Sequence, residues 1–276
     1  MKNIIVLYHG DCSDGFSGAW AAWKKFGNKA NYVPLYRQLP PPRLKGKELY
    51  FIDFTYNADV MKRFLKDNKR VVVLDHHVSA REEVKISSDY RYAVDNSGAV
   101  LAWKYFHPGK SIPQLLRYVE DGDLWRHSFK ETKLIYAFLD MTLQNFMAWD
   151  SLVKDLENKS KRKVYFERGK LLLAYEKRLI EKIASGAELV RFAGHKTLAV
   201  NSPTLTSELG SLFYKKLPPM AIIWSERKGN IIVSLRSNGK IDVSKIAAKY
   251  GGGGHKASAG FSFPVGKKLP WKVLEK

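Results

Sequence analysis

Apolar residues in the first half of the chain form short continuous runs that alternate with segments of helical periodicity. The continuous runs, which suit strands buried on both faces, are 3–8, 49–54 and 70–74. The helical segments are 15–26, 57–66, 97–106 and 114–120. Asn57 is the predicted N-cap of the second of these helices. Strands that alternate with helices predict a parallel sheet built from right-handed crossovers.

The second half begins with one long amphipathic segment and continues as a shorter mixed region. Apolar residues recur every three or four positions within 159–187, with Lys and Arg between them, which predicts one long helix. The elements predicted after it are a strand at 193–200, a helix at 207–215, a hairpin of 220–225 and 230–236, a helix at 242–249 and a strand at 259–263.

These patterns predict an α/β protein of three parts. A parallel-sheet N-terminal domain covers residues 1–150, a helical linker covers 151–188, and a smaller mixed α/β C-terminal domain covers 189–276. We expect the active site in the cleft between the two domains.

Composition narrows the class of protein. None of the apolar runs approaches the roughly 20 residues of a membrane span, and no signal peptide is recognisable. The single cysteine, Cys12, excludes an intrachain disulfide and a thiolate zinc site, and it fits a reducing cytoplasm. A net charge of +20 favours a polyanionic partner such as short RNA, DNA or a nucleotide. We expect a cytoplasmic monomer or homodimer with no membrane partner.

Four segments carry more carboxylate and imidazole than a fold requires. They are His9-Gly10-Asp11-Cys12-Ser13-Asp14-Gly15, Ile52-Asp53, Asp75-His76-His77 and Glu120-Asp121-Gly122-Asp123. Each alone has an ordinary explanation as a helix cap or a polar turn. Together they fall at predicted strand or helix ends, where open parallel sheets bind ligands. Clustered carboxylates repel one another unless a cation neutralises them, so the four segments predict a metal site.

The kinds of ligand restrict the metal. Imidazole and carboxylate without sulfur suit Mn²⁺, Fe²⁺, Co²⁺ or Zn²⁺. Six or seven such ligands exceed the needs of one ion, whereas two ions about 3.5–4 Å apart, bridged by a carboxylate, would use them all. Such pairs of ions catalyse the hydrolysis of phosphoesters.

A glycine-rich stretch near the C-terminal end is a candidate phosphate-binding loop, although a flexible linker is the alternative. Consecutive glycines let backbone N–H groups approach a phosphate closely, and Arg236 offers a guanidinium fork. The candidate substrate-binding residues are Arg236, Gly252, Gly253, Gly254, His255 and Lys256. Trp125, just after the fourth acidic segment, is the best placed of the tryptophans to stack on a base.

At these motifs the sequence resembles the DHH phosphoesterase superfamily. Asp75-His76-His77 resembles the motif that names the family, and His9 to Gly15 resembles its first motif. The stretch from Gly252 to Gly260 is similar to the glycine signature of the DHH-associated substrate domain. The first motif departs in spacing, with one residue between His9 and Asp11 and two between Asp11 and Asp14, where several family members have three and one.

The resemblance implies a role for each residue. His9, Asp11 and Asp75 would hold one ion; Asp14, His76 and Asp121 would hold a second, with Asp123 as the alternative to Asp121. Asp53 would bridge the ions, and His77 would contact the substrate phosphate. Asp53, Asp75, His76 and His77 are the expected catalytic residues, and the cofactor is two divalent ions, Mn²⁺ first, with Mg²⁺ or Co²⁺ as alternatives.

The predicted function is metal-dependent hydrolysis of short oligonucleotides or small nucleotides by metal-activated water, as in nanoRNases and exonucleases. The alternatives are a phosphatase for pAp or polyphosphate, a cyclic-dinucleotide phosphodiesterase, and a nucleic-acid-binding protein without catalysis.

Overall fold

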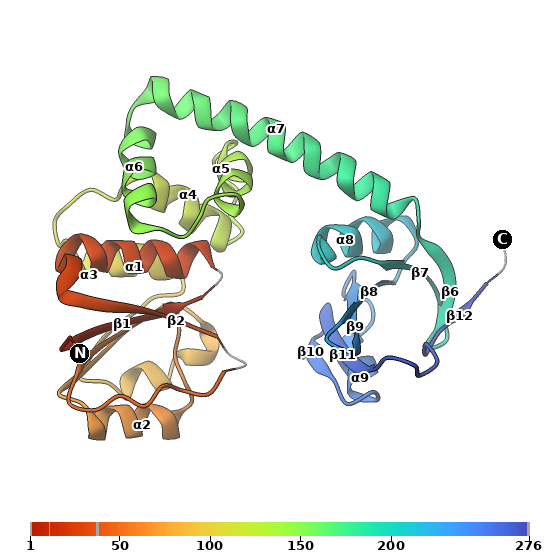
Figure 1. Cartoon of the computed structure of the whole chain (residues 1–276), viewed down its shortest axis with the longest axis horizontal. Helices are drawn as coiled ribbons and strands as arrows, with labels where there is room; N and C mark the ends of the chain where they lie inside the picture. The colour runs from red at the N-terminus through yellow and green to blue at the C-terminus, as the bar shows by residue number, and fades with distance from the viewer. Residues whose placement is uncertain (1, 11, 37–38, 275–276) are drawn as a thin grey trace. The chain divides into compact units, whose positions relative to one another are not determined.

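The computed structural model describes residues 2–10, 12–36 and 39–274. The chain divides into two compact units, Met1–Leu173 and Ala174–Lys276, with the division inside the long helix α7 (Lys159–Ala184) (Figure 1). The predicted domain limits, and the predicted cleft between the domains, stay predictions.

The first unit is built on a parallel sheet of five strands in the order β2-β1-β3-β4-β5. The strands are β1 (Ile4–His9), β2 (Ala30–Leu35), β3 (Glu48–Ile52), β4 (Arg70–Asp75) and β5 (Asp89–Tyr92). The parallel sheet confirms the predicted fold class. The pattern of apolar runs did not predict β2 and β5, which are the two edge strands and are less buried than the centre.

Helices cover both faces of this sheet, as Figure 1 shows for α1 and α2. Alternate residues of β1, such as Val6 and Tyr8, face the core shared with α1 and α3, whereas Ile5 and Leu7 face the core shared with α2. The helices of this unit are α1 (Ser13–Phe26), α2 (Ala58–Asp67), α3 (Gly98–Phe106), α4 (Gln114–Asp123), α5 (Thr132–Asp140) and α6 (Phe146–Glu157). Burial on both faces explains why the central strands read as continuous apolar runs.

The second unit has a mixed sheet of seven strands in the order β10-β11-β9-β8-β7-β6-β12. The strands are β6 (Glu188–Phe192), β7 (His195–Asn201), β8 (Met220–Arg227), β9 (Asn230–Ser237), β10 (Gly253–His255), β11 (Ser258–Pro264) and β12 (Lys272–Val273). Helix α8 (Thr206–Lys216) and the end of α7 pack on one face, and α9 (Val243–Ala248) packs on the other. The helix α9 begins at its predicted cap, Asp242, whose side chain accepts a hydrogen bond from Ser244 N.

Two local expectations for the second unit were wrong. The strand expected at 193–200 begins only at His195, because Ala193 and Gly194 form a turn with φ of 48° and 84°. The glycine stretch expected as a loop is largely the strand β10, which pairs antiparallel with β11. No helix among the described residues is long and apolar enough to cross a membrane.

Candidate metal centre

The carboxyl ends of three neighbouring strands bring the predicted ligands together. Strands β1, β3 and β4 are adjacent and parallel, and they end at His9, Ile52 and Asp75. Asp53 continues the ladder of β3, since its N–H donates to Leu74 O at 2.9 Å. Its φ of 57° is left-handed, a conformation that aspartate adopts more readily than most residues. The sharp turn after β3 therefore leaves the Asp53 side chain at the edge of the sheet.

Asp53 lies at the centre of the cluster, with imidazoles near both of its carboxylate oxygens. Its Oδ2 is 3.2 Å from His9 Nδ1 and 3.7 Å from Cys12 Sγ. Its Oδ1 is 3.2 Å from His76 Nε2 and 3.6 Å from His77 Nδ1. The residue is only 1% exposed. A carboxylate that faces two sets of donors has the arrangement that a bridging ligand needs.

Asp14 is held by the N-terminus of a second helix. Gly98 N donates to Asp14 Oδ2 at 2.7 Å, and Ala99 N donates to Asp14 Oδ1 at 2.9 Å. The unpaired amides and the positive end of the α3 dipole favour a carboxylate at this point. Gly98 must lack a side chain, because a Cβ there would lie 2.6 Å from the Cβ of Asp53 and 2.9 Å from Asp14 Oδ2.

Asp121 and Asp123 point in different directions from the end of α4. Asp123 Oδ2 lies 3.5 Å from His76 Nε2, is buried, and has no hydrogen-bond partner among the described residues. The carboxylate of Asp121 accepts hydrogen bonds from Ser128 N at 2.7 Å, Phe129 N at 3.3 Å and the Thr132 hydroxyl. Residues two apart on a helix lie about 200° apart around its axis. The structure therefore brings Asp123 to the cluster and not Asp121, the reverse of the expected preference.

Asp75 uses both carboxylate oxygens within the turn that follows β4. Its Oδ1 accepts from His76 N at 2.7 Å and His77 N at 3.1 Å, and lies 2.7 Å from His77 Nδ1. Its Oδ2 accepts from the Thr55 hydroxyl. Asp75 therefore sets the orientation of the His77 ring, and its role as a metal ligand stays a prediction. Asp11 lies outside the described residues.

The pKa values reflect this crowding of charge. Burial alone would raise the pKa of Asp53, but hydrogen bonds to His76 and His9 outweigh it and lower the pKa to about 2. Burial would lower the pKa of His76, but the hydrogen bond to Asp53 and the nearby carboxylates raise it to about 9. Burial and the charge of Asp53 raise the pKa values of Asp14 and Asp123. In the absence of a cation, the surroundings thus favour a charged Asp53 beside a protonated His76 and oppose the charged forms of Asp14 and Asp123.

The donor set fits divalent cations. Three groups of ligand atoms lie within 4.8 Å of one another among the described residues: His9, Cys12 and Asp53; Asp53, His76 and His77; and Asp14, His76 and Asp123. The unpartnered Asp123 Oδ2 and the raised pKa values of two carboxylates are the features that a cation would relieve. Burial raises the pKa of the Cys12 thiol above its ordinary value, which argues against a nucleophilic thiolate.

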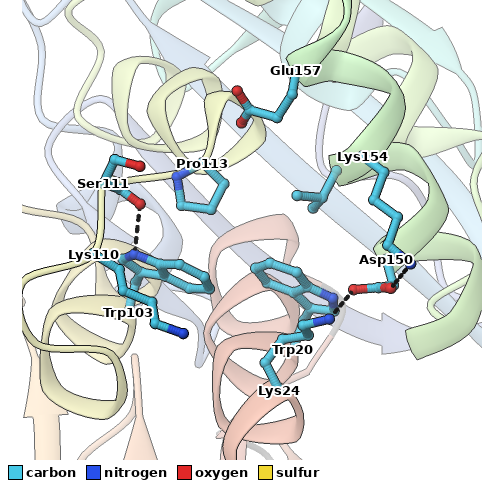
Figure 2. Close-up of a pocket in the computed structure, with 10 residues that line it drawn as sticks. Trp20, Lys24, Trp103, Lys110, Ser111, Pro113, Asp150, Lys154 and Glu157 are labelled. Atoms are coloured by element: carbon cyan, nitrogen blue, oxygen red, sulfur yellow. Dashed lines mark hydrogen bonds and ion pairs between the residues drawn. The ribbon is translucent and has the colours of Figure 1, made fainter.

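A separate cavity of about 540 Å³ lies over α1, α3 and α6 and shares none of these ligands (Figure 2). Asp150 pairs there with Lys24 and Lys154, at 2.8 Å each. The rings of Trp20 and Trp103 stack beneath it at 5.5 Å and belong to the core, as their helical spacing predicts. Of its two acidic residues, Asp150 is neutralised by lysines and Glu157 accepts a hydrogen bond from Gln114 N, so this cavity does not gather carboxylates as the metal cluster does.

The candidate substrate-binding residues of the second unit gather around the hairpin of β10 and β11. Arg236 on β9 and His255 on β10 are both in register with Ser258 on β11. Arg236 is half-buried, and burial lowers the pKa of its guanidinium. His255 and Lys256 are exposed at the turn.

The glycines of this hairpin have a packing role of their own. A Cβ on Gly252 would lie 2.1 Å from Gly260 O, and one on Gly254 would lie 2.6 Å from Ala259 Cα. Gly253 is exposed with nothing within 4 Å of such an atom. Close pairing of β10 with β11 therefore requires Gly252 and Gly254. The packing of the hairpin gives no reason for a glycine at position 253, so Gly253 is the one of the three whose presence would be explained by a bound ligand.

Sequence reasoning missed two residues that shape the centre. Gly98 provides space and amides for Asp14, and Thr55 holds Asp75. The signal for Gly98 was the helix start at Ser97, whose side chain caps Val100 N. Thr55 follows β3 in an irregular segment and carries no pattern that could have indicated its role.

The chain is similar to known proteins in sequence and in fold. A family model described as the DHHA1 domain matches residues 189–271. The uncharacterized protein R106 of Acanthamoeba polyphaga mimivirus is 30% identical, over 94% of this chain and 67% of its own length. The oligoribonuclease NrnB of Bacillus subtilis is 26% identical, over 75% of this chain and 56% of its own length. The solved DHH domain of a member of a ribosomal protein family has the same fold, with a TM-score of 0.65, 13% identity, and 94% and 82% of the two chains covered.

Proposed function

Because the chain belongs to the DHH phosphoesterase superfamily, whose members are metal-dependent hydrolases of phosphoester bonds, we propose that it hydrolyses short oligonucleotides or small nucleotides as a phosphodiesterase. The observation that carries the proposal is the cluster of Asp14, Asp53, His76 and Asp123 at the carboxyl ends of the strands. The similarity of the chain to an oligoribonuclease supports oligonucleotides as the substrate class.

Two divalent ions fit the shared ligands. Asp53 belongs to two of the three groups and has two oxygens with which it could bridge two ions, whereas His76 can give its Nε2 to only one of them. His9 and Asp53 would be ligands of one ion. Asp14, Asp123 and His76 would be ligands of the other. When bound, the ions would lower the pKa of a bound water and would neutralise the charge on the attacking and leaving oxygens. Imidazole and carboxylate donors fit Mn²⁺, our first choice, and also Co²⁺; Mg²⁺ is the further alternative.

His77 would bind the substrate phosphate. Its Nδ1 is engaged by Asp75, so its other ring nitrogen is free to act as a donor, and the side chain is 32% exposed. The hydrogen bond to Asp75 raises the pKa of His77 and so favours the imidazolium, which attracts a phosphate. Asp75 would then be a positioning residue for this contact.

The second unit offers candidate contacts of its own for a phosphate. Arg236 on β9 offers a planar pair of donors, and His255 and Lys256 are exposed at the turn of the hairpin, with β11 between His255 and Arg236. The backbone of Gly253 could approach a phosphate without side-chain obstruction. The chain's charge of +20 favours any polyanionic substrate.

A substrate panel tests the proposal. Purified protein with Mn²⁺, Mg²⁺ or Co²⁺ is incubated with 5′-labelled RNA and DNA of two, five and twenty nucleotides, with pAp, with polyphosphate and with a cyclic dinucleotide. We expect the fastest turnover on the shortest RNA. Turnover only of pAp or polyphosphate would replace the proposal with a phosphatase, and no turnover of any substrate would refute catalysis.

Matched variants show whether turnover belongs to the cluster. Asp53→Asn keeps the size of the side chain and a residue type that tolerates a φ of 57°, but removes the bridging charge. We expect at least a hundredfold loss of kcat with a native circular dichroism spectrum. Asp59→Asn, which alters an exposed carboxylate on α2, is the control.

A further inference from the structure

The loop after α4 exposes a tryptophan beside the metal cluster. Trp125 is 81% exposed, far more than the other tryptophans of the described chain, which lie in or near the cores. Tryptophan offers a large aromatic face, on which another ring can stack. Trp125 is not among the residues proposed to bind metal or phosphate.

The backbone of this loop is strained in a way that fixes the ring. Trp125 and His127 both have left-handed φ, of 53° and 48°. A bulky residue in that conformation persists only where the surroundings hold it there. The rings of Trp125 and His127 meet edge to face, at 5.7 Å and 88°. The histidine ring therefore supports the tryptophan from one side.

Asp121 is the residue that holds the loop. Its main-chain carbonyl accepts hydrogen bonds from Arg126 N at 2.9 Å and His127 N at 3.3 Å. Its carboxylate accepts from Ser128 N, Phe129 N and the Thr132 hydroxyl. Arg126 also reaches Glu120 and Asp95 O. One buried aspartate thus shapes the whole turn, which explains why it is not available to the metal cluster.

The loop lies within one nucleotide of the cluster. Trp125 follows Asp123 by two residues, so their Cα atoms are at most about 7.6 Å apart. Asp123 Oδ2 is in turn 3.5 Å from His76 Nε2. A nucleotide whose phosphate lies at the cluster would therefore have its base near the loop that carries Trp125.

We propose that Trp125 is the stacking platform for a nucleobase next to the scissile phosphate, so that the substrate must carry a base there. The inference rests on the proposed function, and it excludes inorganic polyphosphate as the preferred substrate because polyphosphate has no base to stack. Stacking on an aromatic ring tolerates all four bases, so the platform selects nucleotides without selecting sequence.

The test combines variants of Trp125 with the removal of bases from the substrate. The substrates are a 5′-labelled diribonucleotide and the same molecule without its bases, and the measurement is kcat/KM. Stacking is worth about 1–3 kcal/mol per base, so Trp125→Ala should lose roughly 5- to 150-fold on the dinucleotide. On the base-free molecule the same substitution should lose less than about threefold. Equal losses on both substrates, or no loss on the dinucleotide, would overturn the platform.

Two further variants separate stacking from apolar contact and from misfolding. Trp125→Phe keeps an aromatic face and should retain most of kcat/KM, whereas Trp125→Leu should resemble Trp125→Ala. Leu143→Ala alters a side chain that is as exposed, at 83%, and should leave the dinucleotide reaction unchanged. Leucine performing as well as phenylalanine would overturn stacking.

Binding without turnover distinguishes this inference from the proposed function. The anisotropy of a fluorescein-labelled dinucleotide is followed with the full chain in EDTA, where metal-dependent hydrolysis is blocked. We expect Trp125→Ala to raise Kd at least fivefold, and an unchanged Kd would overturn the platform. Trp125-dependent binding together with no turnover in Mn²⁺ would refute the proposed function and support the platform.

Discussion

Asp121 and Asp123 lend themselves to a direct comparison, because the same substitution should have opposite effects at the two sites. Burial would raise the pKa of Asp121, but hydrogen bonds from Thr132, Ser128 and Phe129 lower it, so the fold stabilises its charge. Burial and the charge of Asp53 raise the pKa of Asp123, so the fold opposes its charge. The prediction is that Asp121→Asn destabilises the metal-free protein and Asp123→Asn does not.

The magnitudes follow from the contacts. Asparagine at position 121 keeps one acceptor oxygen but turns a donor toward Phe129 N or Thr132, losing charge-assisted bonds worth about 2–3 kcal/mol in total. For a chain of this size, that corresponds to a fall of roughly 5–10 °C in Tm. Asparagine at position 123 removes one of three mutually repelling carboxylates, so Tm in EDTA should stay level or rise by a few degrees.

Added metal should stabilise Asp121→Asn much more than Asp123→Asn. An ion at about 100 times its Kd stabilises the folded state by about 2.7 kcal/mol. The wild type and Asp121→Asn should both gain roughly 5–10 °C on addition of Mn²⁺, and Asp123→Asn should lose most of that gain. Thermal unfolding in EDTA and across a Mn²⁺ titration measures both effects, with Asp59→Asn as the control. The reasoning is refuted if Asp121→Asn abolishes the Mn²⁺ shift while Asp123→Asn keeps it.

The remaining predictions concern neighbouring residues. Gly98→Ala places a Cβ 2.6 Å from the Cβ of Asp53, so we expect at least tenfold weaker Mn²⁺ binding by titration calorimetry, and unchanged binding would show that α3 can shift. His76 has a pKa of about 9 in the metal-free fold against 6.5 unfolded, so its proton stabilises the fold fully below pH 6.5, and this stability is lost as pH rises toward 9. Urea unfolding in EDTA should show that loss, and His76→Gln should remove it; a stability that rises from pH 6.5 to 9 would contradict the assignment. Burial raises the pKa of Cys12, so iodoacetamide at pH 8 should react with it at least tenfold more slowly than with free cysteine, and equal rates would contradict the burial.

The central part of the fold was predictable because burial on both faces leaves a strong signal. β1, β3 and β4 have apolar centres and were found from sequence, as were the helices that cap on Asn57 and Asp242. The edge strands β2 and β5 were not found. β2 contains Pro34, which sheets tolerate at an edge, and β5 has only four residues, Asp-Tyr-Arg-Tyr, with no continuous apolar run.

The composition of the cluster was predictable from sequence, but the direction of each side chain was not. Ordered strand ends located His9, Asp53 and His76 without a structure, since topology alone brings those positions to one edge. The loop at 125–132 keeps Asp121 away from the cluster, because the amides of Ser128 and Phe129 donate hydrogen bonds to its carboxylate. Hydrogen bonds from a loop without periodicity leave no pattern in the sequence.

The order of the ligands along the chain has a consequence for biosynthesis. Every residue of the three metal-binding groups precedes position 124, and all belong to the first unit, which has its own cores. Domains fold from the N-terminus as they leave the ribosome. The nascent chain thus contains all the candidate ligands before the second unit has been fully translated. Under the proposed function, metal would be acquired before the candidate substrate-binding residues of the second unit are in place, so the metal supply during translation would influence which ion is bound.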